Sequence, residues 1–169
     1  MKFVIAVICI VVFFVVVAIS LSKTSTICLE DQNKEIVYLS YVAFNLSDWT
    51  SFAKLHSPLY LQHAPDYEDP IPLGAYELSC RTARKRFPDL KYRIEDIFAF
   101  EDKVSVRLRW QCSNSSMAFK EYFPDGVGAG SMISIVRIRN GKIIEEWCEY
   151  DTVGIQKMIR SVKSMEHNK

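Results

Sequence analysis

The pattern of apolar and polar residues divides the chain into a helical front half and a β-stranded back half. Residues 33–44 carry apolar side chains at helical spacing, which predicts an amphipathic helix. Asp48 can cap a short second helix, and a third should follow Gly74 and end before Pro88, because the residue preceding proline disfavours α geometry. The apolar faces of the first and third helices are predicted to comprise Ile36, Leu39, Val42 and Ala43, and Tyr76, Leu78, Ala83 and Phe87, respectively.

The back half shows a period of two, which is the spacing of strands with one buried face. The clearest run is 104–112, where apolar and polar residues alternate. Short turns such as Glu101-Asp102 join the runs, so neighbouring strands should pair antiparallel. Helices followed by strands predict an α+β fold. The expected strands are Leu90–Phe100, Val104–Cys112, Met117–Phe123, Ser131–Ile138 and Lys142–Tyr150, with Gly126, Gly128 and Gly130 in a flexible loop.

A long apolar segment opens the chain. From Phe3 to Leu21 only Ser20 is polar, and a lysine flanks the segment on each side. The segment is long enough to cross a bilayer core of about 30 Å. It also contains the apolar stretch and the small residues, Ala18-Ile19-Ser20, that a cleaved signal peptide requires. The sequence therefore predicts either a signal peptide or a single transmembrane anchor over residues 1–22.

The rest of the chain has the length of one domain, large enough to bury a core. We expect a linker over 23–32, a single domain over 33–162 and a tail over 163–169. Glycosylation sequons begin at Asn45 and Asn114, and such sequons are used only in the secretory pathway. We therefore expect a protein of that pathway, either secreted or single-pass with its domain outside the cytoplasm.

Four cysteines outside the apolar segment form an even set, which can make two disulfides in an oxidising compartment. The sequence does not choose among the three pairings. Because they show no CxxC spacing, a zinc site is not expected. A net charge of +1 gives no field that would attract nucleic acid. The four cysteines are Cys28, Cys80, Cys112 and Cys148.

Several short segments share the order and spacing of one known family. They are Tyr60-Leu61-Gln62-His63-Ala64-Pro65, Gly74, Phe87-Pro88-Asp89-Leu90, Glu101-Asp102-Lys103-Val104, the run from Arg137 to Trp147, and Asp151. Together, over about Asn33 to Ile159, they resemble the SnoaL-like polyketide cyclase family of the nuclear-transport-factor-2-like superfamily. The resemblance implies a cone of helices wrapped by a curved antiparallel sheet, with a pocket lined by the concave face of that sheet.

The resemblance also implies where catalytic residues would lie. In characterised cyclases of the family, an Asp on the last strand and a His on the preceding strand transfer protons. On this sequence the Asp position falls on Cys148 and the His position on Ser134, so both catalytic identities are absent.

The hairpin between the last two strands determines which residues face the pocket. A two-residue turn, Asn140-Gly141, would pair Ser134 with Trp147. A three-residue turn with Gly141 left-handed would pair Ser134 with Glu146. The family's spacing requires the second, because residues on one face must match in parity. The pocket face would then comprise Met132, Ser134, Glu146, Cys148 and Tyr150.

Glu146 and His63 are the candidate catalytic residues. A carboxylate desolvated in an apolar pocket has a raised pKa and can transfer protons near neutral pH, so Glu146 could replace the missing Asp. The alternative is a rim carboxylate, paired or solvated. His63 could face the pocket mouth or be a surface histidine. Cys148 lacks a nearby histidine that would activate it, which favours a disulfide or a small buried thiol.

We expect structural roles for the residues that neighbour Glu146 and Cys148 on the last strand. Glu145 and Trp147 should lie on the other face by parity, as surface and packing residues. Asp151 should cap a last helix over Val153 to Val162.

Three functions remain open from the sequence. The first is a binding module for a small apolar molecule. The second is a cofactor-free cyclase or isomerase in which Glu146 or His63 abstracts a proton next to a carbonyl. The third is an interaction domain that forms a homodimer through its sheet. None of these requires a cofactor or a metal, and membrane contact is expected only through the N-terminal segment.

Overall fold

The structure, a computed structural model, describes residues 2–113, 117–120, 123–151 and 153. Side-chain environments are described for these residues except 2–10, 18, 20–28 and 117–118. The helices are α1 (Lys2–Leu46), α2 (Trp49–Leu55), α3 (Leu73–Arg86) and α4 (Met117–Lys120). The strands are β1 (His56–His63), β2 (Ile71–Pro72), β3 (Lys91–Phe100), β4 (Lys103–Ser113), β5 (Val127–Arg139) and β6 (Lys142–Tyr150).

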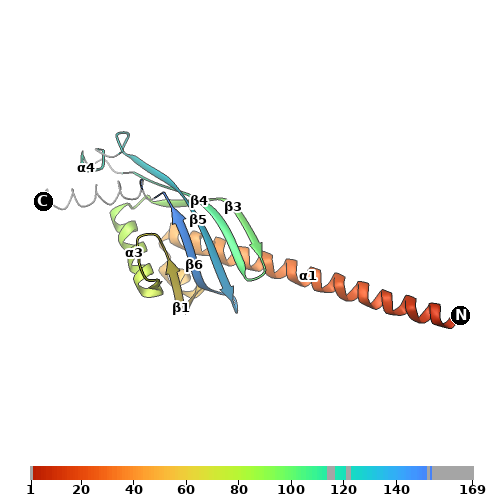
Figure 1. Cartoon of the computed structure of the whole chain (residues 1–169). Helices are drawn as coiled ribbons and strands as arrows, with labels where there is room; N and C mark the ends of the chain where they lie inside the picture. Colours follow the sequence, from red (N-terminus) through yellow and green to blue (C-terminus); the bar gives the residue numbers. More distant parts are fainter. Residues whose placement is uncertain (1, 114–116, 121–122, 152, 154–169) are drawn as a thin grey trace.

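The six strands form one curved sheet in the order β2-β1-β6-β5-β4-β3. All neighbours pair antiparallel except β1 and β6, which run parallel. The end of α1 packs against β3 and β4, and α3 packs against β1 (Figure 1). The predicted α+β fold is confirmed.

The hairpin between β5 and β6 has the two-residue turn, so the three-residue turn that the family's spacing was expected to require is wrong. Arg139 pairs with Lys142 across Asn140-Gly141. Both turn residues have positive φ, 52° and 69°, as a type I′ turn requires. A bulge at Ile144 then adds one residue to β6, so Ser134 pairs with Cys148. Both predicted pairings of Ser134 are wrong. The observed partner, Cys148, lies two residues from Glu146, so the residues assigned to the pocket face still share one face.

The buried faces of two helices differ from prediction. Leu39 on α1 is 40% exposed and Leu78 on α3 is 65% exposed. On α1 the sheet side carries polar residues, because they find partners there: the Asn33 Nδ2 atom donates a hydrogen bond to the Glu101 carbonyl at 2.9 Å. The buried face of α1 comprises Asn33, Val37, Ser40, Tyr41, Ala43 and Phe44.

The strand predicted over Met117–Phe123 is wrong. Residues 117–120 form α4, and the backbone N–H of Phe123 donates to the Phe119 carbonyl at 2.9 Å. The rings of Phe119 and Phe123 stack with centroids 4.8 Å apart. A spacing of four residues places two side chains on one face of a helical turn, which explains why this segment is not a strand.

The prediction of a flexible glycine-rich loop is also wrong, because β5 begins at Val127 and includes two of the three glycines. A Cβ atom at Gly130 would lie 2.6 Å from the indole of Trp110. One at Gly128 would lie 3.1 Å from the Phe119 ring. These glycines therefore leave room for aromatic rings across the strand and do not mark a flexible connection.

The sequence missed β1 and β2, which cover the edge of the sheet beside β6. The cap predicted for α2 is confirmed, since Asp48 Oδ1 accepts a hydrogen bond from the Ser51 N–H at 3.0 Å.

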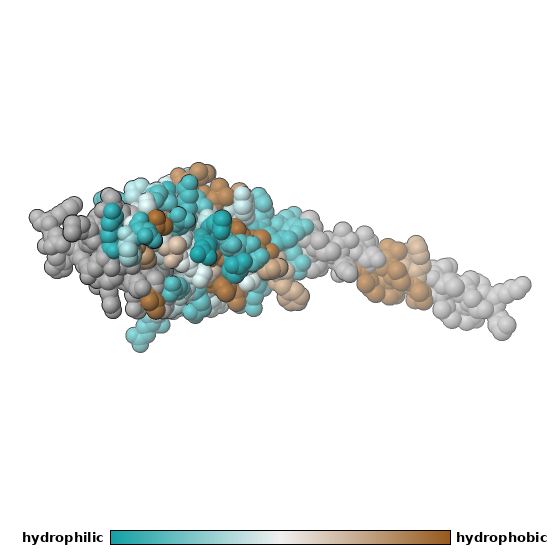
Figure 2. All heavy atoms as spheres, turned by 90° about the horizontal axis from the view of Figure 1, so that it is seen from above, coloured by the Kyte–Doolittle hydropathy of each residue, from teal (hydrophilic) through white to brown (hydrophobic). Residues whose placement is uncertain are grey.

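The N-terminal segment continues into the domain as one helix. α1 is unbroken through residues 23–32, where a linker was expected. Within the part of the chain that is described, no helix is both long and apolar enough to cross a membrane. Much of the predicted segment Phe3–Leu21 has no described side chains, but Val11–Val17 are exposed around the projecting helix (Figure 2). Asn114, the tail over 163–169 and, beyond Val153, the predicted last helix lie outside the described residues.

Candidate functional site

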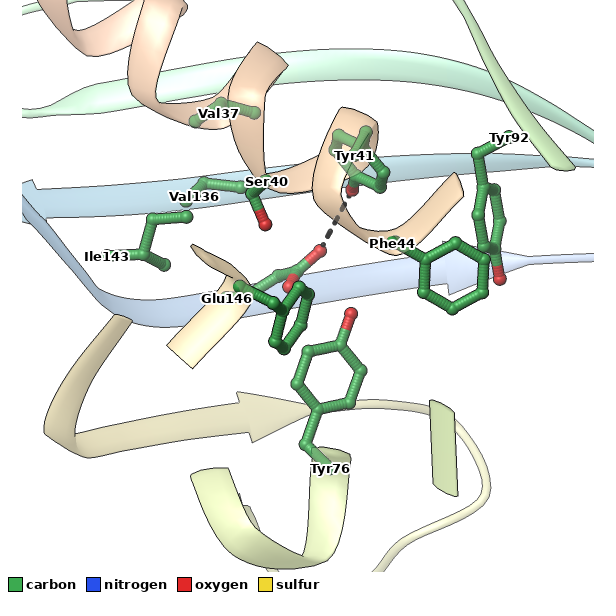
Figure 3. Close-up of a pocket in the computed structure, with 10 residues that line it drawn as sticks. Val37, Ser40, Tyr41, Phe44, Tyr76, Tyr92, Val136, Ile143 and Glu146 are labelled. Carbon is green, nitrogen blue, oxygen red and sulfur yellow. Dashed lines mark hydrogen bonds between the residues drawn. The ribbon is translucent and has the colours of Figure 1, made fainter. Parts of the chain in front are cut away.

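Glu146 lies at the centre of the concave face, on β6, with 4% of its surface exposed. Tyr41 on α1 donates its hydroxyl to the Oε1 atom at 3.2 Å, and Tyr60 on β1 donates to the Oε2 atom at 2.8 Å. Figure 3 shows Tyr41 reaching the carboxylate from the helix above it. Each carboxylate oxygen therefore has a phenolic donor.

Burial governs the protonation of this group. Burial raises the pKa of Glu146, although the nearby hydroxyls of Ser134, Tyr60 and Tyr41 act in the opposite direction. Burial, together with the negative charge of Glu146, also raises the pKa of each of the two tyrosines well above the usual value. Ser134 lies close enough to favour the carboxylate, yet among the described residues its Oγ atom has no partner in full hydrogen-bond geometry. The site therefore contains a carboxyl group that accepts a proton more readily than an exposed glutamate.

The space beside Glu146 is divided into two cavities. The inner one, at the carboxylate, has a volume of about 10 Å³, close to the minimum for one water molecule. The outer chamber has a volume of about 170 Å³. Phe44, Tyr76 and Tyr92 line both cavities. These three rings therefore form a partition between the carboxylate and the outer chamber.

The outer chamber lies between α3, the β1–β2 loop and the concave face of the sheet. Most of its lining is apolar or aromatic, with polar groups at Gln62, Asp66 and Ser79. Of the pocket residues predicted from the sequence, Glu146 lines the inner cavity, and Ser134 is fully buried. The others line the outer chamber and are Met132, Cys148 and Tyr150.

Disulfides through the three cysteines that the structure describes are wrong, whereas the alternative given for Cys148, a small buried thiol, is confirmed. Cys80, Cys112 and Cys148 are buried thiols, placed on α3, β4 and β6. Burial raises the pKa of Cys80 and of Cys112 to about 12, and it also raises that of Cys148. Because a thiolate is the reactive form, none of them is an activated nucleophile. The side chain of Cys28 lies outside the described part of the chain.

His63 lies on the outer face of the sheet, so of its two predicted places the pocket mouth is wrong and the surface position is confirmed. β1 pairs in parallel with β6, so Gln62 aligns with Glu146 and His63 with Trp147. The His63 and Trp147 rings stack with centroids 5.2 Å apart. The Nε2 atom of His63 also lies 3.0 Å from Glu145 Oε1. Strand alternation therefore separates His63 from Glu146.

Trp147 and Glu145 lie on the outer face, where they were predicted as packing and surface residues. The Arg137 guanidinium lies 4.9 Å from the Trp147 ring centroid and 2.6 Å from Glu145 Oε2. Ile133 and Ile135 on this face are 52% and 43% exposed. Dimer formation through this face stays a prediction.

Sequence reasoning missed the tyrosines that hold the carboxylate, and also His56. The inward residues of β1 are His56, Tyr60 and Gln62, whereas the exposed ones include Leu59 and Leu61. This inverts the usual pattern of apolar inside and polar outside, which concealed the strand. Burial lowers the pKa of His56 to about 4, so this histidine is neutral, and its Nδ1 atom donates to the Phe52 carbonyl at 2.7 Å.

Other predicted residues have structural partners. Asn45 makes two hydrogen bonds with the backbone of Tyr92: its Nδ2 atom donates at 2.7 Å and its Oδ1 atom accepts at 2.8 Å. The amide that would carry a glycan is therefore engaged in the folded domain. The Asp151 N–H donates to the Ser131 carbonyl at 3.2 Å. Within the described residues, no cluster of three or more His, Cys, Asp or Glu side chains could hold a metal ion.

Solved structures share this fold at low sequence identity. AclR of Streptomyces galilaeus is 20% identical, with 79% of this chain and 98% of its own covered and a TM-score of 0.63. IdmH of Streptomyces antibioticus, a candidate polyketide cyclase, is 22% identical over 75% of this chain and 98% of its own, with a TM-score of 0.63. A SnoaL-like polyketide cyclase of Agrobacterium tumefaciens is 17% identical over 75% and 97%, with a TM-score of 0.59.

Among curated proteins, none matches this chain significantly. The family model of the SnoaL-like polyketide cyclases matches residues 35–159. This range includes the concave face, the tyrosines around Glu146 and the whole outer chamber. The chain belongs to the SnoaL-like polyketide cyclase family.

Proposed function

We propose that this domain binds a small, largely apolar molecule in the outer chamber. The observation that carries the proposal is a chamber of about 170 Å³ lined mostly by aromatic and apolar side chains, with polar groups that include Gln62, Asp66 and Ser79. Such a lining is typical of small-molecule sites, and sites for drug-sized ligands span about 300–1,000 Å³. The ligand should therefore be compact, with one or two rings. The cyclase names of the structural relatives agree with a ligand of polyketide character.

The geometry favours binding over catalysis. Both oxygens of Glu146 already accept hydrogen bonds, and the free volume beside them is about 10 Å³. Phe44, Tyr76 and Tyr92 separate this space from the chamber. A ligand in the chamber would meet Cys148, where the family's cyclases carry their Asp. We therefore infer that the family's Asp and His are not retained in this chain.

Binding can be tested with 2-naphthol, a fluorescent two-ring phenol of suitable size. Ala83 lines the chamber, and Ala83→Leu should fill part of it and weaken binding about tenfold. Ala75→Leu is the matched control, because Ala75 is an exposed residue on the same helix. Equal affinity of the two variants for 2-naphthol would contradict the proposal.

Cofactor-free proton transfer by Glu146 is the second candidate function, favoured by the buried carboxyl group with its raised pKa. It requires the aromatic partition to open. The test is deuterium exchange next to the carbonyl of 2-tetralone, followed by NMR. The binding proposal predicts the same exchange rate with and without protein. Acceleration that Glu146→Gln abolishes would establish the catalytic function.

We also propose that Phe3–Leu21 is retained as a membrane anchor, with the domain outside the cytoplasm. The apolar sequence and its continuity with the domain helix support this. The buried thiols and the engaged Asn45 add no support for export. The intact chain, of 19.5 kDa, should stay with membranes after alkaline carbonate extraction. A shorter soluble chain would contradict the anchor.

A further inference from the structure

α1 leaves the domain at the end of the sheet that contains the β3–β4 turn. As it departs it passes the β3–β4 turn, where Glu30 accepts a hydrogen bond from the Glu101 N–H at 3.2 Å and Asn33 donates to the Glu101 carbonyl at 2.9 Å. The β5–β6 hairpin ends beside this turn, since the Ile138 N–H donates to the Asp102 carbonyl at 2.7 Å. Both hairpin tips therefore lie at the end of the sheet from which α1 projects (Figure 1).

This end exposes large apolar side chains on the outer face of the sheet. Phe98 and Phe100, near the tip of β3, are 66% and 73% exposed. Leu59 on β1 is 85% exposed and lines a surface groove of about 550 Å³ together with Leu61 and Ile144. These apolar side chains lie toward both edges of the sheet end, on β3 and on β1, and exposed apolar groups of this kind are found on surfaces that meet a membrane or another molecule.

Basic residues accompany these apolar groups. Arg139 and Lys103 are exposed, and neither pairs with a carboxylate among the described residues. Arg137 is already engaged, because Glu145 lies 2.6 Å and Asp102 3.7 Å from it. Lys103 and Arg139 are thus the cations at this end that can meet a phosphate group, beside the exposed carboxylates of Glu101 and Asp102 in the β3–β4 turn.

The helix sets the distance between this end and a bilayer. Val11–Val17 are between 36% and 65% exposed, and Figure 2 shows an apolar band on the visible side of the projecting helix. Glu30 follows Leu21 by nine residues, which is about 14 Å of helix. The headgroup layer occupies about 5–8 Å of this distance. A tilt of about 20°, common for membrane helices, brings one side of the domain closer.

We propose that this end of the sheet rests on the phospholipid bilayer in which α1 is anchored. Phe98 and Phe100 enter the boundary between the headgroups and the acyl chains, where interfacial protein segments bury Phe and Leu side chains. Lys103 and Arg139 contact lipid phosphates. This contact is additional to the N-terminal segment, and it depends on that segment being retained as an anchor.

The proposed orientation also places the outer chamber relative to the membrane. Tyr67 and Tyr150, which line the chamber, lie at the opposite end of the sheet from the two hairpin tips. The side of the chamber that Tyr67 and Tyr150 line then faces away from the membrane. Because Tyr67 is 42% exposed, a ligand that enters beside it would come from the aqueous side.

The test uses the full chain in nanodiscs of phosphatidylcholine, whose headgroups supply the phosphates. Para-azidophenylalanine replaces one aromatic residue at a time, and lipid adducts are measured by mass spectrometry after illumination. Phe100 should give at least about tenfold more adduct than Tyr67, which is an exposed aromatic at the far end. Substituting both Lys103 and Arg139 with Gln should lower the Phe100 yield.

Phe13 provides the control for the anchor, because it lies within the apolar part of α1. Adducts at Phe13 with equal yields at Phe100 and Tyr67 would overturn the docking proposal alone. Absence of adducts at Phe13 would overturn the anchor and the docking together. Neither result bears on 2-naphthol binding, which is measured separately.

Discussion

Glu145 and Glu146 are neighbours on β6, yet they have different surroundings. Glu146 faces the concave side, where two tyrosines donate to it and burial raises its pKa. Glu145 faces outward and lies at hydrogen-bond distance from Arg137 and His63. The same side chain is thus a buried proton acceptor on one face and part of a surface ion-pair cluster on the other. In this fold, strand parity determines the chemistry open to a carboxylate.

The largest effect that this comparison predicts is for Glu146→Ala. The hydroxyls of Tyr41 and Tyr60 would remain buried without their acceptor, which should reduce the free energy of unfolding by about 3 kcal/mol. Urea unfolding monitored by circular dichroism measures this. A loss below about 1 kcal/mol would mean that the hydroxyls find other partners and that the carboxylate is not central to the core.

A smaller loss is expected for Gly130→Ala, on the same concave side. The new Cβ atom would lie 2.6 Å from the rigid indole of Trp110, and such overpacking should cost about 2 kcal/mol. Gly74→Ala is the matched control, since nothing lies within 4 Å of its Cβ position. The control should be neutral or stabilising by up to about 1 kcal/mol. Equal thermal shifts of both variants would contradict the close packing of Trp110.

The fold was predictable where local pattern and tertiary packing agree. The period of two in β4 and the cap at Asp48 are local features, and the structure contains both. The family resemblance, which rests on the order of short motifs, predicted helices packed on a curved antiparallel sheet. These signals need no knowledge of what lies opposite each residue.

The site was less predictable, because its partners come from distant elements. Tyr41 and Tyr60 are far from Glu146 in sequence, and β1 was concealed by its exposed leucines. The bulge at Ile144 has no sequence signal, although it decides which residues pair across the hairpin. Gly128 and Gly130 were predicted to lie in a loop because glycines are common in loops. Their place in a strand is explained only by the aromatic rings that pack against them, and the sequence does not show where those rings lie.

The pH dependence of stability gives a further, smaller contrast between the two glutamates. The pKa of Glu146 is raised in the folded state, so the unfolded chain loses this proton first as the pH rises. The contribution of Glu146 to stability should therefore be largest below the usual pKa of 4.5 and should fall as the pH rises through the folded pKa. Urea unfolding over a pH series measures it. Glu146→Gln should reduce the dependence of the free energy of unfolding on pH. An unchanged dependence would mean that another titratable group causes it.

The smallest effect is expected for Glu145→Ala, on the outer face. Glu145 lies 2.6 Å from Arg137 and 3.0 Å from His63, but water reaches the cluster. Ion pairs of this kind contribute about 1 kcal/mol or less, and the contribution decreases with salt. Unfolding in low and high salt measures both properties. A loss as large as that of Glu146→Ala would show that the outer cluster supports the fold as strongly as the buried site, and strand parity would then not separate the two glutamates.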